Sequence, residues 1–387
     1  MESYTILTEL GSGTYGTVYK ARDNRSGRIV AVKHMRRKYK SWSECVTLKE
    51  VKSLLKMRAH ANIVQLLEVL RQREDLYFVF EYINAGNLFD YISARRTAGQ
   101  AIREDEARDL FRQILEGLSH IHSSNYMHRD LKCENVLVSE NDGGRVAKIA
   151  DLGCAKSLLE RPPHTVYVGT RWYRAVELFL KDSSYTAKND IWACACMLCE
   201  MLLMRPLFPG ANDISMLNLI TGTLGAPRRE DWPAGYALAD KMGYRFPNYT
   251  QPMSEKLRLL LPDVSDECIS LLCGLFEYDP AKRLSAADAL LHPWFSNRAP
   301  STMLGRSTGP GGPGGCDGKL QLARDAVQRA TQRLTDVPVE GISLTTSVGA
   351  GVKPPTAART TKDLLQLTDD DGEMHDNQML DMIDDLL

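Results

Sequence analysis

The spacing of apolar residues changes near residue 88, and this change restricts the chain to a fold with two unlike parts. Between residues 4 and 83, short runs of β-type residues alternate with turn residues, which predicts a small sheet. Between the third and fourth runs, Cys45–Met57 carries an apolar stripe at helical spacing, so one helix is expected beside the sheet. The predicted strands are Tyr4–Leu10, Thr17–Arg22, Ile29–His34, Val64–Arg71 and Leu76–Tyr82.

From residue 88 onward, apolar residues recur at the spacing that is typical of helices. The predicted helices are Ala107–His122, Asp190–Leu203, Ile214–Leu224, Cys268–Phe276 and Ala286–His292. We therefore predict a bilobal α+β fold, with a five-stranded sheet lobe over residues 1–83 and a larger helical lobe over residues 84–295. A chain of 387 residues is long enough for both lobes and a further segment.

The remaining residues, 296–387, differ sharply in composition from both lobes. Residues 300–316 are rich in Gly, Pro and Ser, and such a segment buries too little apolar surface to order itself. A short basic helix is predicted over residues 319–334. Residues 363–387 hold nine Asp or Glu and no Lys or Arg. This mostly disordered tail ends either in a solubilising segment or in a helix that folds into a partner's groove.

Charge and cysteine content favour a soluble protein of a reducing compartment. Lys and Arg number 48 against 49 Asp and Glu, so no overall field directs the chain to nucleic acid or a membrane. The nine cysteines have no regular spacing, which indicates free thiols. Cys194, Cys196 and Cys199 lie in one apolar run and are interpreted as buried structural residues rather than metal ligands. We find no secretory signal and no membrane span, and expect a cytoplasmic protein.

A glycine-rich segment, Gly11-Ser12-Gly13-Thr14-Tyr15-Gly16-Thr17-Val18, lies between the first two predicted strands. Glycines let backbone amides approach phosphate oxygens without a side-chain clash. A glycine hairpin without a ligand has the same pattern, so this signal alone is weak. The strand that follows argues against a dinucleotide fold, which requires a helix after the glycines.

A lysine on the third predicted strand gives the glycine segment a partner. Lys33, in Ala31-Val32-Lys33, is placed where it can reach a nucleotide's phosphates, and Glu50 on the following helix can hold it by an ion pair. Taken in isolation, two such residues would be interpreted as an ordinary surface salt bridge.

Two further motifs supply the groups that phosphoryl transfer needs. They are His128-Arg129-Asp130-Leu131-Lys132-Cys133-Glu134-Asn135 and Asp151-Leu152-Gly153. Asp130 can orient a hydroxyl and accept its proton, and Lys132 can neutralise charge on the transferred group. Asn135 and Asp151 supply oxygen ligands for Mg²⁺. The whole set in this order predicts an enzyme that uses ATP and Mg²⁺.

These motifs make residues 4–295 resemble a eukaryotic protein kinase domain. Lys132, two places after Asp130, resembles serine/threonine kinases. The segment Gly169-Thr170-Arg171-Trp172-Tyr173-Arg174 resembles the group that contains cyclin-dependent and MAP kinases, in which the arginine matching Arg174 favours proline just after the target residue. Leu207-Phe208-Pro209-Gly210 resembles the start of that group's insert.

Within the group, three segments are similar to the male-germ-cell-associated, intestinal-cell and long-flagella kinase family. They are Tyr39–Cys45, Leu48–Leu54 and Asp231–Tyr236. The resemblance implies signalling through phosphorylation of protein substrates, an upstream activating kinase, a monomer, and a role in cilium or flagellum length. It adds the cilium or flagellum and the nucleus as locations. The helix around Glu50 lacks the cyclin-binding signature, so no cyclin is expected.

The resemblance also assigns a nucleotide-binding set. Phe80 is expected to back the adenine pocket, while Glu81 and Ile83 offer backbone groups. The full nucleotide-binding set is Leu10, Gly11, Ser12, Gly13, Thr14, Tyr15, Gly16, Val18, Ala31, Lys33, Phe80, Glu81 and Ile83. Outside this set, the resemblance implies a structural pair between Glu177 and Arg283.

Two hydroxyl pairs are candidate regulatory sites. Thr165-Val166-Tyr167 matches the family's Thr-x-Tyr dual phosphorylation site, where Arg129 and other basic side chains can pair with added phosphate; an ordinary exposed loop is the alternative. Phosphate on Thr14 or Tyr15 would inhibit by repelling ATP.

Three positions depart from the usual kinase pattern. Leu152 stands for Phe, Cys133 for Pro and Val176 for Pro, and none of these changes removes a reacting group. A pseudokinase scaffold, which uses the fold for binding alone, is the rival interpretation. Retention of the catalytic set argues against it, and Asp190 is expected to hold the catalytic loop.

Overall fold

The computed structural model describes residues 1, 3–13, 15–46, 48, 51, 53, 59–84, 86–141, 144–248 and 251–296. Thr14 and Glu50 lie outside these residues, so the predicted ion pair between Lys33 and Glu50 stays a prediction. The predictions made for 300–316, 319–334 and 363–387 lie outside them as well.

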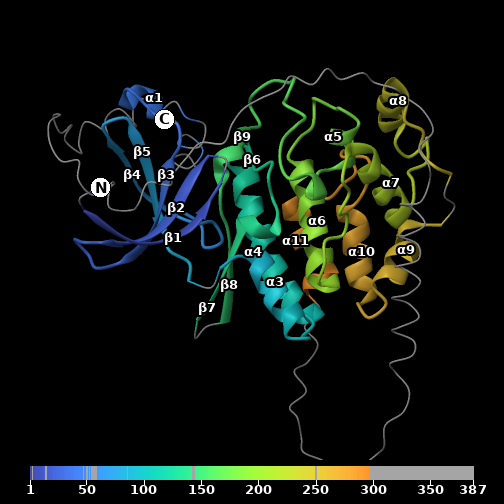
Figure 1. Cartoon of the computed structure of the whole chain (residues 1–387). Coiled ribbons are helices and arrows are strands. Elements are labelled where there is room, and N and C mark those ends of the chain that lie inside the picture. Colours follow the sequence, from blue (N-terminus) through green and yellow to red (C-terminus); the bar gives the residue numbers. More distant parts are fainter. Residues whose placement is uncertain are drawn as a thin grey trace, which may run out of the picture. The chain divides into compact units, whose positions relative to one another are not determined.

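The N-terminal part is an antiparallel sheet with the strand order β1-β2-β3-β5-β4 (Figure 1). Each predicted strand is confirmed to within a few residues. A short helix, α1 (Trp42–Val46), lies beside the sheet, and the described residues Val51 and Ser53 of the predicted Cys45–Met57 helix are helical. The strands are β1 Tyr4–Ser12, β2 Gly16–Asp23, β3 Ile29–Met35, β4 Leu66–Gln72 and β5 Asp75–Glu81.

The two faces of this sheet bury different clusters because side chains alternate along each strand. On β5, Tyr77 and Val79 pack with one cluster, which includes Val30 of β3. Leu76 and Phe78 point to the opposite face of the sheet. They pack with Cys45 of α1 and with Val51, a helical residue that follows α1. The sheet is therefore apolar on both faces and forms a core of its own.

The C-terminal part is mainly helical, and all the helices predicted there are present (Figure 1). Four further helices, α3, α5, α8 and α9, were not predicted. Helix α5 has four residues, too few to show a helical period. The others bury too few side chains to leave a helical stripe: α3 buries only Leu88 and Ile92, and α9 only Leu257. The helices are α3 Leu88–Thr97, α4 Glu104–Ser123, α5 Val176–Phe179, α6 Lys188–Leu203, α7 Asp213–Leu224, α8 Pro233–Met242, α9 Met253–Leu260, α10 Asp266–Leu275 and α11 Ala286–Leu290.

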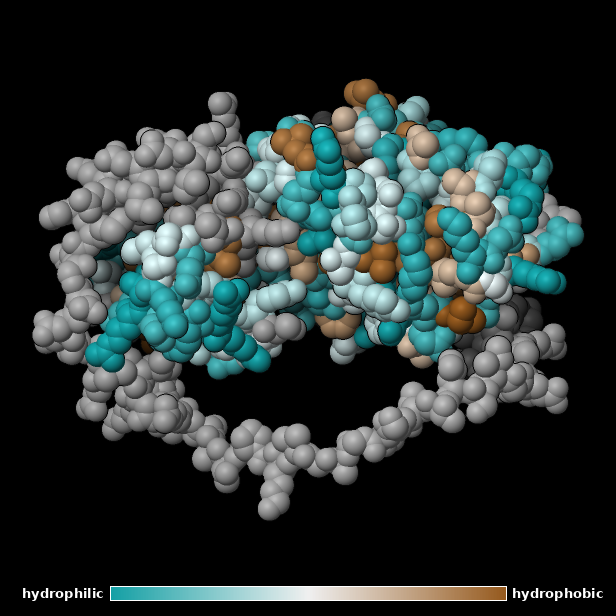
Figure 2. All heavy atoms as spheres, turned by 90° about the horizontal axis from the view of Figure 1, so that it is seen from above, coloured by the Kyte–Doolittle hydropathy of each residue, from teal (hydrophilic) through white to brown (hydrophobic). Residues whose placement is uncertain are grey.

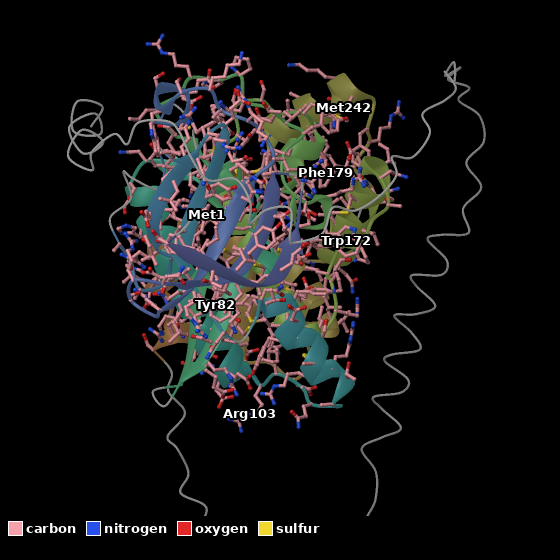
Figure 3. The ribbon with its side chains drawn as sticks, turned by 60° about the vertical axis from the view of Figure 1, so that its left-hand side comes forward. Met1, Tyr82, Arg103, Trp172, Phe179 and Met242 are labelled. Carbon is pink, nitrogen blue, oxygen red and sulfur yellow. The ribbon has the colours of Figure 1, made fainter. Side chains whose placement is uncertain are left out.

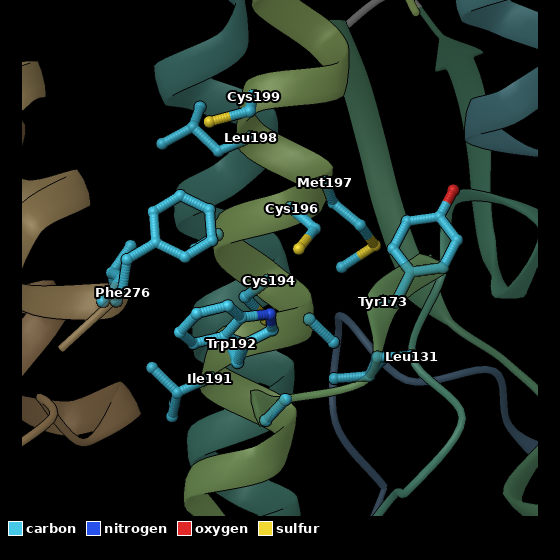
Figure 4. Packing of buried hydrophobic residues seen from close by; sticks show 14 of the residues in the cluster. Leu131, Tyr173, Ile191, Trp192, Cys194, Cys196, Met197, Leu198, Cys199 and Phe276 are labelled. Atoms are coloured by element: carbon cyan, nitrogen blue, oxygen red, sulfur yellow. The ribbon is translucent and has the colours of Figure 1, made fainter. Parts of the chain in front are cut away.

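Helix α6 is buried almost throughout and forms the centre of this part (Figure 4). Trp192 packs edge-on against Phe276, which follows α10, with ring centroids 5.0 Å apart. Cys194, Cys196 and Cys199 are all buried in this helix, which confirms the prediction of buried thiols. A helix that is enclosed on every side is expected to be apolar on all its faces, and most residues of α6 are apolar.

Short strands and 3₁₀ turns carry the catalytic motifs between α4 and α5. Strands β7 and β8 form a hairpin, and β6 pairs with β9, so both motifs lie beside these strand pairs. Single 3₁₀ turns cover Cys133–Asn135 and Leu152–Cys154. Two more, Arg171–Tyr173 and Pro293–Phe295, lie further along. The strands are β6 Tyr126–Met127, β7 Val136–Asn141, β8 Gly144–Ile149 and β9 Lys156–Ser157.

Apolar residues on the face shown in Figure 2 form small groups between hydrophilic ones. The most exposed large apolar side chains are Leu291, Leu159 and Leu259, which come from separate elements. Among the described residues, no helix is both long and apolar enough to cross a membrane.

A buried ion pair joins α5 to the segment before α11. Arg283 donates through Nη1 and Nη2 to the two carboxylate oxygens of Glu177, at 2.8 and 3.0 Å. Both side chains are almost fully enclosed, and Arg283 also donates to the carbonyls of Glu277 and Lys188. The predicted pair between Glu177 and Arg283 is confirmed.

Replacing Glu177 by Ala should lower the free energy of unfolding by about 3–5 kcal/mol, because a buried guanidinium would be left without its counter-charge. Denaturant melts followed by circular dichroism measure this change. The matched control is Glu230→Ala, which removes an exposed partner of Arg228 and should leave the midpoint within error. Equal midpoints for both variants would contradict the structural role of the pair.

Candidate active site

A cavity of about 420 Å³ lies between the sheet and the helical part, a size suited to a small organic ligand. Of the predicted nucleotide-binding residues, eight line it: Leu10, Gly11, Val18, Ala31, Lys33, Phe80, Glu81 and Ile83. Others in its wall were not predicted for this role, because they come from segments without a motif: Ile63, Val64, Tyr82, Gly86, Asn87, Asp90, Leu137, Ile149 and Ala150. Tyr82, at the end of β5, is labelled in Figure 3.

The tip of the glycine-rich segment does not line the cavity. Ser12, Gly13, Tyr15 and Gly16 are absent from its wall, and Ser12 Oγ instead lies 3.2 Å from Thr17 Oγ1 across the hairpin. A β-carbon at Gly16 would lie 2.1 Å from the carbonyl oxygen of His34, so only glycine fits where β2 meets β3.

Tyr15 connects this hairpin to the segment that follows the Asp151-Leu152-Gly153 motif. Its hydroxyl lies 3.5 Å from Sγ of Cys154, which directly follows Gly153. That contact, together with the neighbouring charge and partial burial, raises the pKa of Tyr15 to about 12, so the phenol stays neutral. The hairpin is thereby tied to the helical part.

Lys33 and Asp151 meet across the cavity from opposite lobes. The Lys33 Nζ atom donates to Oδ1 of Asp151 at 3.0 Å, and the lysine side chain is almost buried. Burial alone would raise the pKa of Asp151, but the charge and hydrogen bond of Lys33 outweigh it and lower the pKa. Asp151 therefore stays ionised in the part of the site where a cation would be held.

Asp130 is held by its neighbours in a defined orientation. The Thr170 amide and hydroxyl both donate to Oδ1 of Asp130, at 2.8 and 3.1 Å. Lys132 Nζ lies 3.5 Å from Oδ2 and donates to Thr170 Oγ1 at 3.1 Å. Thr170 is a site residue that sequence analysis missed, because it lies 40 residues away in the chain. Its place within the Gly169–Arg174 motif was the available signal.

Asn135 and Asp151 present oxygens that suit Mg²⁺. Asn135 uses its amide nitrogen to donate to the Asp130 carbonyl at 2.8 Å, which directs its Oδ1 elsewhere. Among the described residues, no donor is hydrogen-bonded to Oδ1 of Asn135 or Oδ2 of Asp151. Mg²⁺ prefers such oxygen ligands, so these two residues fit the ion.

Asp190 holds the backbone of the catalytic loop, as predicted. Its carboxylate accepts from the amides of His128 and Arg129, each at 2.8 Å, and contacts Nε2 of His122 at 2.9 Å. Burial alone would raise the pKa of Asp190, but these hydrogen bonds and the neighbouring histidines lower it. The loop thus depends on a carboxylate that remains charged inside the protein.

All three departures from the usual kinase pattern are buried. Leu152 and Val176 fill apolar positions in the core, and Cys133 is fully enclosed. The Cys133 thiol and the Tyr173 hydroxyl share the buried carboxylate of Glu200, with 2.7 Å between Tyr173 Oη and Glu200 Oε2. Burial raises the pKa of Glu200. Glu200 was not predicted, since it lies inside an apolar helix and belongs to no motif.

The Thr-x-Tyr segment is exposed, and its two hydroxyl residues have different surroundings. Arg129, the predicted phosphate partner, donates to the Cys154 carbonyl at 2.7 Å and to the Tyr185 hydroxyl at 3.3 Å. Tyr185 in turn donates to the Thr165 carbonyl at 2.8 Å, so Arg129 lies on the Thr165 side. Tyr167 instead contacts Lys181.

A sheet lobe and a helical lobe that enclose a nucleotide-sized cavity, with an ionised aspartate beside a lysine, define the catalytic domain of a protein kinase. The protein kinase domain model matches residues 4–295, and the chain belongs to that family. The predicted fold class is confirmed. Members of this family use ATP and Mg²⁺.

The proteins similar to this chain include serine/threonine-protein kinases. Serine/threonine-protein kinase ICK of Mus musculus is 43% identical over 309 residues, which cover 80% of this chain and 47% of that protein. Serine/threonine-protein kinase MAK of Homo sapiens is 43% identical over 295 residues, 76% of this chain and 46% of that protein. Cyclin-dependent kinase F-4 of Oryza sativa is 40% identical over 295 residues, 76% of this chain and 62% of that protein.

The resemblance predicted from the three family segments is thereby confirmed. The chain carries a protein kinase domain similar to those of the serine/threonine-protein kinases ICK and MAK. It spans about half the length of these two relatives.

Asp190→Asn should destabilise the protein by about 1.5–3 kcal/mol near neutral pH, because charge-assisted hydrogen bonds are lost. The pKa of Asp190 in the folded protein lies below the ordinary value of 3.8. The stabilisation by its carboxylate is therefore present above pH 3.8 and disappears as the pH falls through the pKa of folded Asp190. Denaturant melts of variant and wild type, from neutral pH to below pH 3.8, measure the difference in the free energy of unfolding. The exposed variant Asp263→Asn is the control. A pH-independent difference would contradict an ionised Asp190.

Proposed function

We propose that the chain transfers the γ-phosphoryl group of ATP to serine or threonine hydroxyls of other proteins, with Asp130 orienting the hydroxyl. The orientation of the Asp130 carboxylate carries the proposal: Thr170 holds one oxygen, while Lys132 and Asn135 approach the other. A carboxylate fixed in this way can accept a hydroxyl proton as the new bond forms. We assign the reaction to lobes 1–83 and 84–295, with 296–387 as a tail.

The remaining residues would position the nucleotide. Lys33, braced by Glu50, would contact the phosphates, and the glycine-rich segment would cover them with backbone amides. Asn135 and Asp151 would hold Mg²⁺, which when bound neutralises charge on the phosphates. The ionised state of Asp151 supports this role, since a protonated carboxyl would bind the cation poorly.

A preference for proline after the target residue is supported by the backbone around Arg174. The Arg174 guanidinium donates to the carbonyls of Val168 and Gly169, at 3.0 and 2.9 Å. Gly169 has φ of 71°, which allows its carbonyl to turn toward Arg174. A carbonyl turned toward Arg174 would be directed away from the amide that follows the target residue, and proline has no such amide to leave unsatisfied.

Wild type should transfer phosphate from Mg-ATP to library peptides in which serine or threonine precedes proline. Asp130→Asn should lower kcat by roughly 10²-fold or more, the usual contribution of a positioned general base. Radiolabel transfer to the library measures both rate and sequence preference. Asp263→Asn, an exposed substitution, should retain wild-type activity. Wild type that binds but never turns over ATP would favour the pseudokinase scaffold instead.

We further infer that phosphorylation at Thr165 and Tyr167 activates the enzyme. Both side chains are exposed and accessible to an upstream kinase. Thr165 is linked through Tyr185 to Arg129, whose neighbour Asp130 is the proposed base. Added phosphate next to these groups would form charge-assisted hydrogen bonds and order the segment.

The double variant Thr165→Ala, Tyr167→Phe should have at least about tenfold lower specific activity than phosphorylated wild type, since each charge-assisted hydrogen bond contributes on that scale. The measurement compares kcat after identical treatment with an activating extract. Phosphatase-treated wild type is the matched control and should resemble the variant. Equal specific activity in all three samples would remove the activation role.

The resemblance to MAK- and ICK-type kinases leads us to propose a monomer that acts without a cyclin and controls cilium or flagellum length from the cytoplasm, the cilium and the nucleus. Protein substrates follow from the kinase class, and their identity is part of this proposal. Imaging of the tagged protein in ciliated cells, with cilium length measured after depletion, tests the role. Unchanged length and absence from cilia would contradict it.

A further inference from the structure

Residues from three separate segments meet around the hydroxyl of Tyr167. The Lys181 Nζ atom, just beyond α5, donates to this hydroxyl at 3.2 Å and lies 4.2 Å from the centre of the tyrosine ring. The same nitrogen donates to Oδ2 of Asp213, the first residue of α7, at 2.8 Å. An ammonium group has three donor hydrogens, so Lys181 can serve a phosphate and Asp213 together.

The Arg174 guanidinium is a second cation near Tyr167. In the chain, Arg174 lies between Trp172 and Phe179, which are labelled in Figure 3. The Arg174 guanidinium is 5.9 Å from the centre of the Tyr167 ring and 5.8 Å from that of Phe179. Asp213 is the carboxylate that opposes these charges, and it also pairs with Arg171 at 3.5 Å.

The backbone presents Lys181 to Tyr167 in a constrained conformation. Lys181 has φ of 62°, in the left-handed region that residues other than glycine rarely adopt. Its amide donates to the Leu178 carbonyl at 3.1 Å, which holds this turn after α5. Such a conformation persists only where the surroundings determine it, and here it places the ammonium between Tyr167 and Asp213.

We propose that Lys181 is the binding site for a phosphate on Tyr167 and clips this segment to α7 through Asp213. The proposal rests on the proposed activation by phosphorylation at the Thr-x-Tyr site. In the modification, the Tyr167 phenol oxygen bonds to the γ-phosphorus of ATP in an upstream kinase. The bond from that phosphorus to ADP breaks, and the phenol proton passes to that kinase's base.

The clip would act on the proposed base through a short stretch of backbone. Thr170, three residues after Tyr167, donates twice to Asp130. Arg174 binds the carbonyls of Val168 and Gly169 between them. A phosphate held by Lys181 would therefore fix the Tyr167 end of the segment 167–170. Thr170, at the other end of this segment, orients Asp130. Arg129 lies on the Thr165 side, so the two phosphates would have separate binding sites.

The test uses the full chain with phosphotyrosine incorporated at position 167 during translation. A tyrosine phosphatase is added, and the release of phosphate is timed. Lys181→Met should release phosphate roughly tenfold faster than wild type, because a charge-assisted hydrogen bond no longer shields it. Lys181→Arg keeps the charge and should stay near the wild-type rate. Lys241→Met, an exposed lysine of α8, is the matched control.

A second measurement on the same proteins is the ³¹P titration of phosphotyrosine. A nearby cation stabilises the dianion, so the phosphate pKa should be lower in wild type than in Lys181→Met. Asp213→Asn removes the carboxylate that shares the Lys181 ammonium with the phosphate. This variant should lower the phosphate pKa further and slow dephosphorylation. Wild-type release rates and phosphate pKa values in both Lys181→Met and Asp213→Asn would overturn the proposal.

These readouts do not depend on kinase activity, so the two proposals can fail separately. If Tyr167 phosphate is protected by Lys181 but leaves kcat unchanged, the binding site stands and the activation role fails. If phosphate raises kcat equally in wild type and Lys181→Met and is not protected in either, activation stands and the Lys181 site is overturned.

Discussion

The active site depends on one buried carboxylate, that of Asp190 in helix α6. It binds the amides of His128 and Arg129, and Arg129 has φ of 70°, a conformation that a loop does not keep unaided. Asp130 follows directly, so its direction is set by this anchor. Through this anchor the loop is attached to a helix that is buried almost throughout.

Further contacts connect the site to the segments around it. The Asp130 carboxylate is bound by Thr170, so Asp130 and the Gly169–Arg174 segment are oriented together. Lys33 and Asp151 join the sheet to the helical part across the cavity. Tyr15 adds a third contact at Cys154. Movement of either lobe would therefore change the relative positions of Lys33, Asp151 and Tyr15.

The positions that depart from the usual kinase pattern keep the packing and add a polar cluster. Leu152 and Val176 are buried where apolar volume is what matters. Cys133 gains a partner in Glu200, which Tyr173 also binds. Since Cys133 belongs to the segment His128–Asn135 and Tyr173 to the segment Gly169–Arg174, this buried carboxylate links the two segments.

The sequence by itself determined the strands, the long helices and the order of Lys33, Asp130, Asn135 and Asp151, because local periodicity and motif spacing encode them. The short helices α3 and α9 escaped prediction because they bury too few side chains to show a period. Only the tertiary structure decided that Thr170 binds Asp130, that Glu200 binds Tyr173 and that Lys181 faces Tyr167. These contacts join residues 14 to 40 positions apart, and no local pattern specifies which distant side chains folding will bring together.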